Sequence, residues 1–64
     1  MNQIAQTIKE RRQFLNITQS ELVDIAGISV RSLKSIELGK ANPTLSLLEK
    51  ILDTLGLTIK IKVK

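Results

Sequence analysis

The chain has 64 residues, the length of one small domain, and such a domain hides only about 60% of the surface that its unfolded chain exposes. It contains no cysteine and no histidine, which excludes disulfide bonds and leaves a zinc site without its usual ligands. Ten Lys and Arg against six Asp and Glu give a net charge of +4 and a pI of about 9.9, which favours a nucleic-acid partner. Association between chains is then the remaining source of added stability.

What the composition lacks disfavours several classes of protein. Without histidine, cysteine or a glycine-rich phosphate loop, we expect no enzyme and no cofactor. No apolar run approaches the roughly 20 residues of a membrane span, so we expect a cytoplasmic protein with no membrane partner. Phe14 is the single aromatic residue, and because base stacking needs aromatic platforms, duplex DNA is favoured over single strands and RNA.

A first helix is predicted from Asn2, whose side chain can cap it, to about Leu15. Its apolar side chains recur at helical spacing, at Ile4, Ile8 and Leu15. Cations gather toward its C-terminal, dipole-negative end: Lys9, Arg11 and Arg12. Asn16 tolerates the left-handed conformation of a helix end, so we expect the helix to stop there.

Two helix starts separated by one glycine follow. Thr18 and Glu21 form a capping box, Gly27 can turn the chain through positive φ, and Ser29 can cap a second helix. The predicted inner faces consist of Leu22, Val23, Ala26, Leu33 and Ile36. The second of these helices points four residues outward: Val30, Arg31, Lys34 and Ser35. This spacing is that of a helix-turn-helix, a DNA-reading device, and the outward residues are the candidates for touching DNA.

A fourth helix is predicted after a short loop. Gly39 is expected to stop the third helix at about Leu38. Pro43 then restricts the backbone where the chain enters the fourth helix. Thr44 is the expected cap of this helix, which ends before Gly56. The predicted inner face of this helix consists of Leu45, Leu48, Ile51, Leu52 and Leu55. The sequence therefore predicts an all-α bundle of four or five helices.

The spacing of apolar residues changes from a helical period to strict alternation over residues 57–64. Apolar side chains occupy every second position, at Leu57, Ile59, Ile61 and Val63, opposite a threonine and three lysines. This pattern predicts a short β-strand, and no second β-like run exists in the chain to pair with it. We expect the same strand of a second copy to pair with it across a two-fold axis, giving a homodimer. There are two alternatives: a different protein supplies the strand that pairs with this edge, or the segment is a disordered lysine-rich tail.

Over residues 2–56 the chain resembles the Xre/Cro/CI-type helix-turn-helix family. The residues that carry the resemblance are Thr18, Gln19, Glu21, Leu22, Gly27, Ile28, Ser29, Leu33, Ile36, Glu37, Gly39, Lys40 and Pro43. The resemblance implies that Gln19 and Lys40 contact phosphates of the operator. It places Ser29, Val30, Arg31 and Ser35 at base-reading positions, with Lys34 beside them. It also implies an internal ion pair between Arg12 and Glu37.

The candidate base readers each have a second interpretation. Arg31 can hold guanine O6 and N7 bidentately, which discriminates by about 1–3 kcal/mol, or it is a solvated cation or a phosphate clamp. Val30 can meet a thymine methyl group or pack on the neighbouring helix. Ser29 is a helix cap first and a base reader second.

Three features depart from the family pattern. Ile25 and Leu38 stand where polar residues are more common, which indicates either a surface for a partner protein or two isolated apolar side chains. The third is the ending, where many members have a fifth helix and this chain has the predicted strand. That ending resembles HipB-like regulators, and this branch implies an antitoxin that binds its own operator as a dimer and holds a HipA-like kinase toxin.

Two functions from different classes follow. The first is a homodimeric repressor of transcription, with residues 1–56 as the helix-turn-helix DNA-binding domain and residues 57–64 as the dimerisation strand. Its operator is expected to be an inverted repeat in double-stranded DNA. The second is a protein-interaction module that keeps the fold and mainly binds a partner protein.

Overall fold

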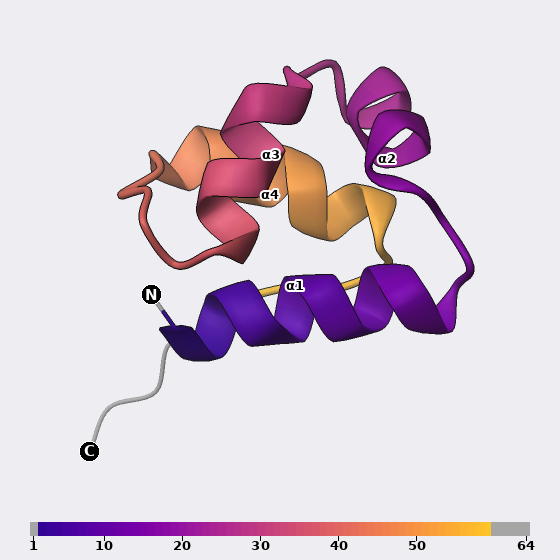
Figure 1. The fold of residues 1–64 in the computed structure, drawn as a ribbon, viewed down its shortest axis with the longest axis horizontal. Helices are drawn as coiled ribbons and strands as arrows, with labels where there is room; N and C mark the ends of the chain where they lie inside the picture. Colours follow the sequence, from indigo (N-terminus) through magenta and orange to yellow (C-terminus); the bar gives the residue numbers. More distant parts are fainter. Residues whose placement is uncertain (1, 60–64) are drawn as a thin grey trace.

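The computed structural model describes residues 2–59 of the 64, and all their regular structure is helical (Figure 1). The four helices are α1 (Asn2–Phe14), α2 (Gln19–Ala26), α3 (Val30–Glu37) and α4 (Leu45–Thr54). The predicted all-α bundle and the order of its four helices are confirmed. None of the helices in this part of the chain has both the length and the apolar character that crossing a bilayer requires.

Hydroxyl side chains start three of the helices, as the sequence predicts. Thr18, Ser29 and Thr44 take an extended backbone conformation, and each side-chain oxygen accepts a hydrogen bond from the amide three residues later. The donor–acceptor distances are 3.0 Å for α2, 3.1 Å for α3 and 3.1 Å for α4. A cap of this kind contributes about 1 kcal/mol, so the boundaries of these helices are fixed by local chemistry.

Residues in the left-handed backbone conformation follow the ends of α1 and α2. Asn16 has a φ of 57°, and the amides of Asn16 and Ile17 bond back to the carbonyls of Gln13 and Arg12 at 3.0 and 3.1 Å. Gly27 has a φ of 72°, and its amide bonds to the Val23 carbonyl at 2.8 Å. The chain therefore turns from α2 into α3 in three residues, through a conformation that glycine adopts without steric cost.

The core lies where all four helices meet. Its buried side chains are Ile8 from α1, Leu22 and Val23 from α2, Leu33 and Ile36 from α3, and Leu48, Ile51, Leu52 and Leu55 from the α4 region. In three dimensions, α2 lies against both α3 and α4, and α1 packs on α3 (Figure 1). Arg11 adds a link to the end of α4, because its Nε donates to the Leu55 carbonyl at 3.0 Å.

Two large apolar residues lie outside the core that their spacing predicts. Leu45 is 58% exposed, and Leu47 packs against the core instead. The reason is tertiary, since the loop between α3 and α4 lies on the Leu47 side of the helix. Leu15 is 36% exposed because it follows the end of α1, where the left-handed turn brings Ile17 onto the core.

The described part of the C-terminal segment runs beside α1. Leu57 packs against the core, and with Thr58 and Ile59 it borders a groove that also touches Gln3, Ile4, Thr7 and Leu52. Residues 57–59 form neither helix nor strand in this single chain, so the predicted strand is not seen there. The rest of it, with Ile61 and Val63, lies outside the described residues, and its pairing between subunits stays a prediction.

The capping box predicts how stability depends on pH. The backbone amide of Thr18 donates to Glu21 Oε1 at 3.0 Å, and this bond, with the Thr18 side chain, holds the pKa of Glu21 below that of a free glutamate. A lowered folded-state pKa stabilises the fold above the unfolded value of about 4.3, and the contribution disappears as pH falls through the folded pKa. We therefore expect the advantage of wild type over Glu21→Gln in urea unfolding to be constant near pH 7 and to shrink below about pH 4.3.

The matched control is Glu49→Gln, which makes the same change of charge at an exposed glutamate of α4. The same pH profile for both variants would show that the capping box makes no specific contribution.

Candidate nucleic-acid interface

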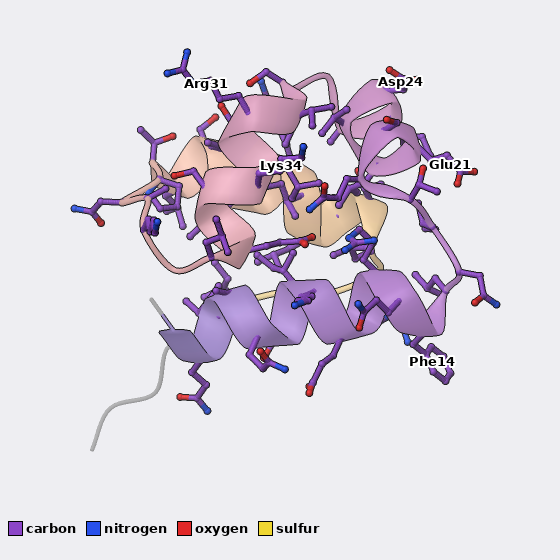
Figure 2. The ribbon with its side chains drawn as sticks, viewed as in Figure 1. Phe14, Glu21, Asp24, Arg31 and Lys34 are labelled. Atoms are coloured by element: carbon purple, nitrogen blue, oxygen red, sulfur yellow. The ribbon has the colours of Figure 1, made fainter. Side chains whose placement is uncertain are left out.

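The outer face of α3 carries the residues predicted to read bases. Leu33 and Ile36 bury the inner face completely or nearly so, at 0% and 2% exposure. Arg31 and Lys34 are exposed on the opposite side, where Figure 2 shows both side chains projecting from the ribbon. The helix is thus held from behind and presents its charged side to solvent.

Arg31 and Ser35 share one hollow at the surface, together with the loop that follows α3. The hollow is also lined by Ser32, Ile36, Ala41, Asn42, Pro43 and Leu47. The loop is fixed to α3, since the amides of Lys40 and Ala41 both donate to the Ser35 carbonyl, at 3.0 and 3.3 Å. Arg31, Ser35 and Asn42 therefore border the same hollow, and the rest of its lining is largely apolar.

Lys34 lies on a different flank of α3 from Arg31 and Ser35. It borders a second hollow, on the α1 side, with Lys9, Gln19 and Leu38. The structure therefore divides the predicted base readers between two sides of the same helix.

The side chains of Ser29 and Val30 make contacts within the protein. The Ser29 hydroxyl caps α3 by accepting from the Ser32 amide at 3.1 Å, and it lies 2.9 Å from the Ser32 hydroxyl. Val30 is half-buried and packs against the core. These contacts favour the capping and packing interpretations, and a contact of either residue with DNA stays a prediction.

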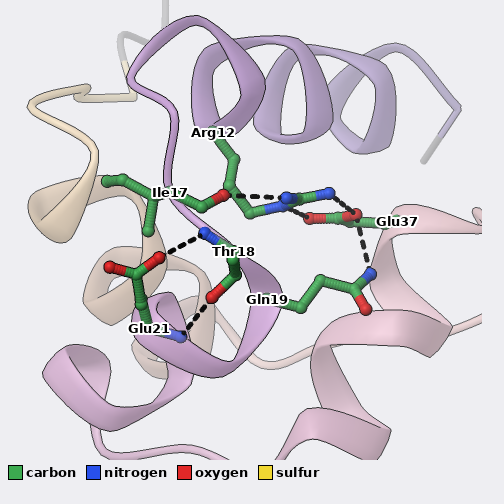
Figure 3. A network of polar contacts seen from close by, with 6 residues as sticks. All are labelled: Arg12, Ile17, Thr18, Gln19, Glu21 and Glu37. Carbon is green, nitrogen blue, oxygen red and sulfur yellow. Dashed lines mark hydrogen bonds and ion pairs between the residues drawn. The ribbon is translucent and has the colours of Figure 1, made fainter.

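The ion pair expected between Arg12 and Glu37 is present (Figure 3). Arg12 Nε donates to Glu37 Oε2 at 2.7 Å, and Nη2 donates to Oε1 at 3.0 Å. The side chains are only 11% and 4% exposed, and the hydrogen bond to Glu37 raises the pKa of Arg12. A third bond runs from Arg12 Nη1 to the Ile17 carbonyl at 2.9 Å, so one guanidinium joins three segments of the chain.

Gln19 belongs to the same network. Its Nε2 donates to Glu37 Oε1 at 3.1 Å, which fixes the side chain at the start of α2. The amide group has a second hydrogen and an acceptor oxygen to offer, so the phosphate contact predicted for Gln19 is compatible with this bond and stays a prediction. Lys40, the other predicted phosphate contact, is exposed just after α3.

Comparison with known proteins fits this geometry. Residues 8–61 match the family described as Helix-turn-helix. The chain belongs to this helix-turn-helix family. It is also 38% identical over 56 residues to the cryptic phage CTXphi transcriptional repressor RstR of Vibrio cholerae serotype O1 (strain ATCC 39315 / El Tor Inaba N16961). That match covers 88% of this chain and 50% of the relative, so the chain spans half the length of the curated relative. No solved structure matches the chain.

The helix-turn-helix unit has an acidic side as well as a basic one. Glu21 and Asp24 are exposed on α2, and Figure 2 shows both on the opposite side of the view from Arg31. Ile25, next to Asp24, is 69% exposed. An anionic polymer is repelled from this side and attracted to the outer face of α3.

Sequence reasoning missed two polar residues that border the hollows of the helix-turn-helix unit. Asn42 lies in the loop predicted between the third and fourth helices, and Lys9 was expected only as a cation near the end of the first helix. The positions of both follow from the tertiary structure, because the loop folds back onto α3 and α1 packs on α3. Residue spacing along the chain carries no signal for either position.

Proposed function

We propose that the protein is a sequence-specific DNA-binding regulator of transcription, acting as a repressor. The observation that carries the proposal is the exposed outer face of α3, held in a helix-turn-helix by a buried inner face and a shielded ion pair. In this motif the second helix lies in the major groove with its N-terminal residues against base edges. The similarity to a phage transcriptional repressor supports the regulatory role.

The reading mechanism separates base contacts from phosphate contacts. Arg31, in the first turn of α3, donates bidentately to guanine, while Ser35 and the exposed start of the helix contact neighbouring base edges. Gln19 and Lys40, at the start of α2 and after α3, hold phosphates on either side. Phosphate contacts fix the register of the protein on the duplex and base contacts supply the specificity.

A homodimer bound to an inverted repeat completes the proposal. Two copies of α3 would enter successive major grooves about 34 Å apart, with half-site centres about 10 base pairs apart or a multiple of that. The proposed contact between copies is the C-terminal segment from Leu57 to Val63. Its support is the alternation of apolar residues, together with Ile59, which is 39% exposed at the edge of the groove between α1 and α4.

Within this proposal, the HipB-like branch makes the protein the antitoxin of a HipBA-like operon. The support is the alternating C-terminal segment in place of a fifth helix. A kinase toxin encoded on the same transcript and co-purifying with the protein would fit this branch. The competing function, a protein-interaction module, draws on the exposure of Ile25 and Leu38, at 69% and 68%.

The proposed contact between Arg31 and guanine can be tested by substitution. Arg31→Ala should weaken binding to the operator by about 5- to 150-fold, the equivalent of about 1–3 kcal/mol for a bidentate contact to guanine. Binding to a scrambled duplex of the same length should change far less. Fluorescence anisotropy with the upstream region of the protein's own gene, beside the scrambled duplex, measures both.

Arg31→Lys is the matched control, because it keeps the charge and removes the planar fork that makes two parallel hydrogen bonds. We expect it to lose most of the preference between the two duplexes while keeping its non-specific affinity. A wild type without preference, or an Arg31→Ala variant with undiminished preference, would contradict the proposed function.

The proposed contact between copies through residues 57–64 can be tested by truncation. A chain truncated after Ile59 keeps Leu57 on the core and should be a monomer or a much weaker dimer, measured by analytical ultracentrifugation. Its operator affinity should fall, because two half-sites are no longer read by one linked unit. A truncated chain that sediments as a stable dimer would show that the helices alone hold the two copies together.

A further inference from the structure

A hollow between α1 and α3 contains Gln19, a proposed phosphate contact, beside two lysines that the mechanism above does not use. It is lined by Lys9, Arg12, Gln19, Lys34, Glu37 and Leu38. The residues come from three helices and from the end of α3, so the hollow exists only in the folded domain. It is separate from the hollow that Arg31 and Ser35 share.

The charged residues that line the hollow carry a net positive charge. Arg12 and Glu37 neutralise each other at its floor through two hydrogen bonds. Lys9 and Lys34 are exposed, and among the residues that the structure describes neither has a carboxylate oxygen within 4.0 Å. Two lysines that border one hollow give it a positive potential, and this potential favours an anion there.

We propose that this hollow binds a phosphate group of the DNA backbone, held jointly by Lys9 and Lys34. The inference rests on the proposed function, since α3 in the major groove brings its flanks close to the two sugar–phosphate backbones. Gln19, whose amide is fixed by Glu37, stands at the same hollow and belongs to the same phosphate track.

The proposal gives new roles to two lysines. Lys9 extends the DNA-binding surface onto α1, which sequence reasoning left outside it. Lys34 becomes a phosphate ligand in place of a base reader, because its hollow is separate from the one that Arg31 and Ser35 share. The site needs no affinity for free phosphate, since α3 in the groove holds the backbone phosphate there at a high effective concentration.

The test is the salt dependence of binding for the full chain and for Lys9→Ala. Each phosphate contact contributes about 0.9 to the slope of log affinity against log salt concentration. We expect Lys9→Ala to lose about 0.9 of slope per bound protomer, so that raising salt from about 50 to about 200 mM weakens wild type about 3.5-fold more for each protomer. Operator and scrambled duplexes should be affected equally, because a phosphate contact reads no sequence.

Lys50→Ala is the matched control, because it removes the same charge from an exposed position of α4 that does not border the hollow. Its slope should stay within about 0.3 of wild type. A Lys9→Ala slope equal to that of Lys50→Ala would overturn the inference, and so would a loss confined to the operator. Either result leaves the effect of Arg31→Ala on sequence preference intact, so failure here is distinct from failure of the proposed function.

Discussion

The shielded ion pair between Arg12 and Glu37 is the interaction on which the geometry of this domain depends. It ties α1 to the last residue of α3, and the same two side chains bind the Ile17 carbonyl and the Gln19 amide at the start of α2. The core sets which faces of the helices are buried, and this network adds directional contacts at the end of α3. Such a pair matters mainly when broken, because a lone charge left in a shielded site has no partner.

The surface charge is divided in a way that suits the proposed role. Arg31 and Lys34 project from the outer face of α3, and Glu21 and Asp24 lie on the other side of the helix-turn-helix unit. The two exposed apolar residues, Leu38 and Ile25, also lie on different sides of the helix-turn-helix unit. Leu38 borders the lysine-lined hollow beside α3, while Ile25 is next to Asp24 on α2. A duplex placed along α3 therefore approaches Leu38 and leaves Ile25 free.

Local chemistry made most of the fold predictable from sequence. The caps at Thr18, Ser29 and Thr44 and the left-handed turn at Gly27 involve residues three or four positions apart, so their patterns are visible in the chain. Spacing failed where tertiary contacts decide, as at Leu45, which lies outside the core that Leu47 enters. The candidate site follows the same rule. Residues on one helix were predicted together, but the separation of Lys34 from Arg31 and the presence of Lys9 arise from how α1 packs on α3.

A double-mutant cycle tests most directly whether the Arg12–Glu37 pair holds the fold together. Urea unfolding of Arg12→Ala, Glu37→Ala and the double variant would be measured in TMAO, which favours the folded state of weakened variants. Each single change should lower the free energy of unfolding by up to about 3–5 kcal/mol, and the double change should cost clearly less than the sum, because it leaves no charge unpaired. Single variants within about 0.5 kcal/mol of wild type, or strictly additive losses, would contradict the account.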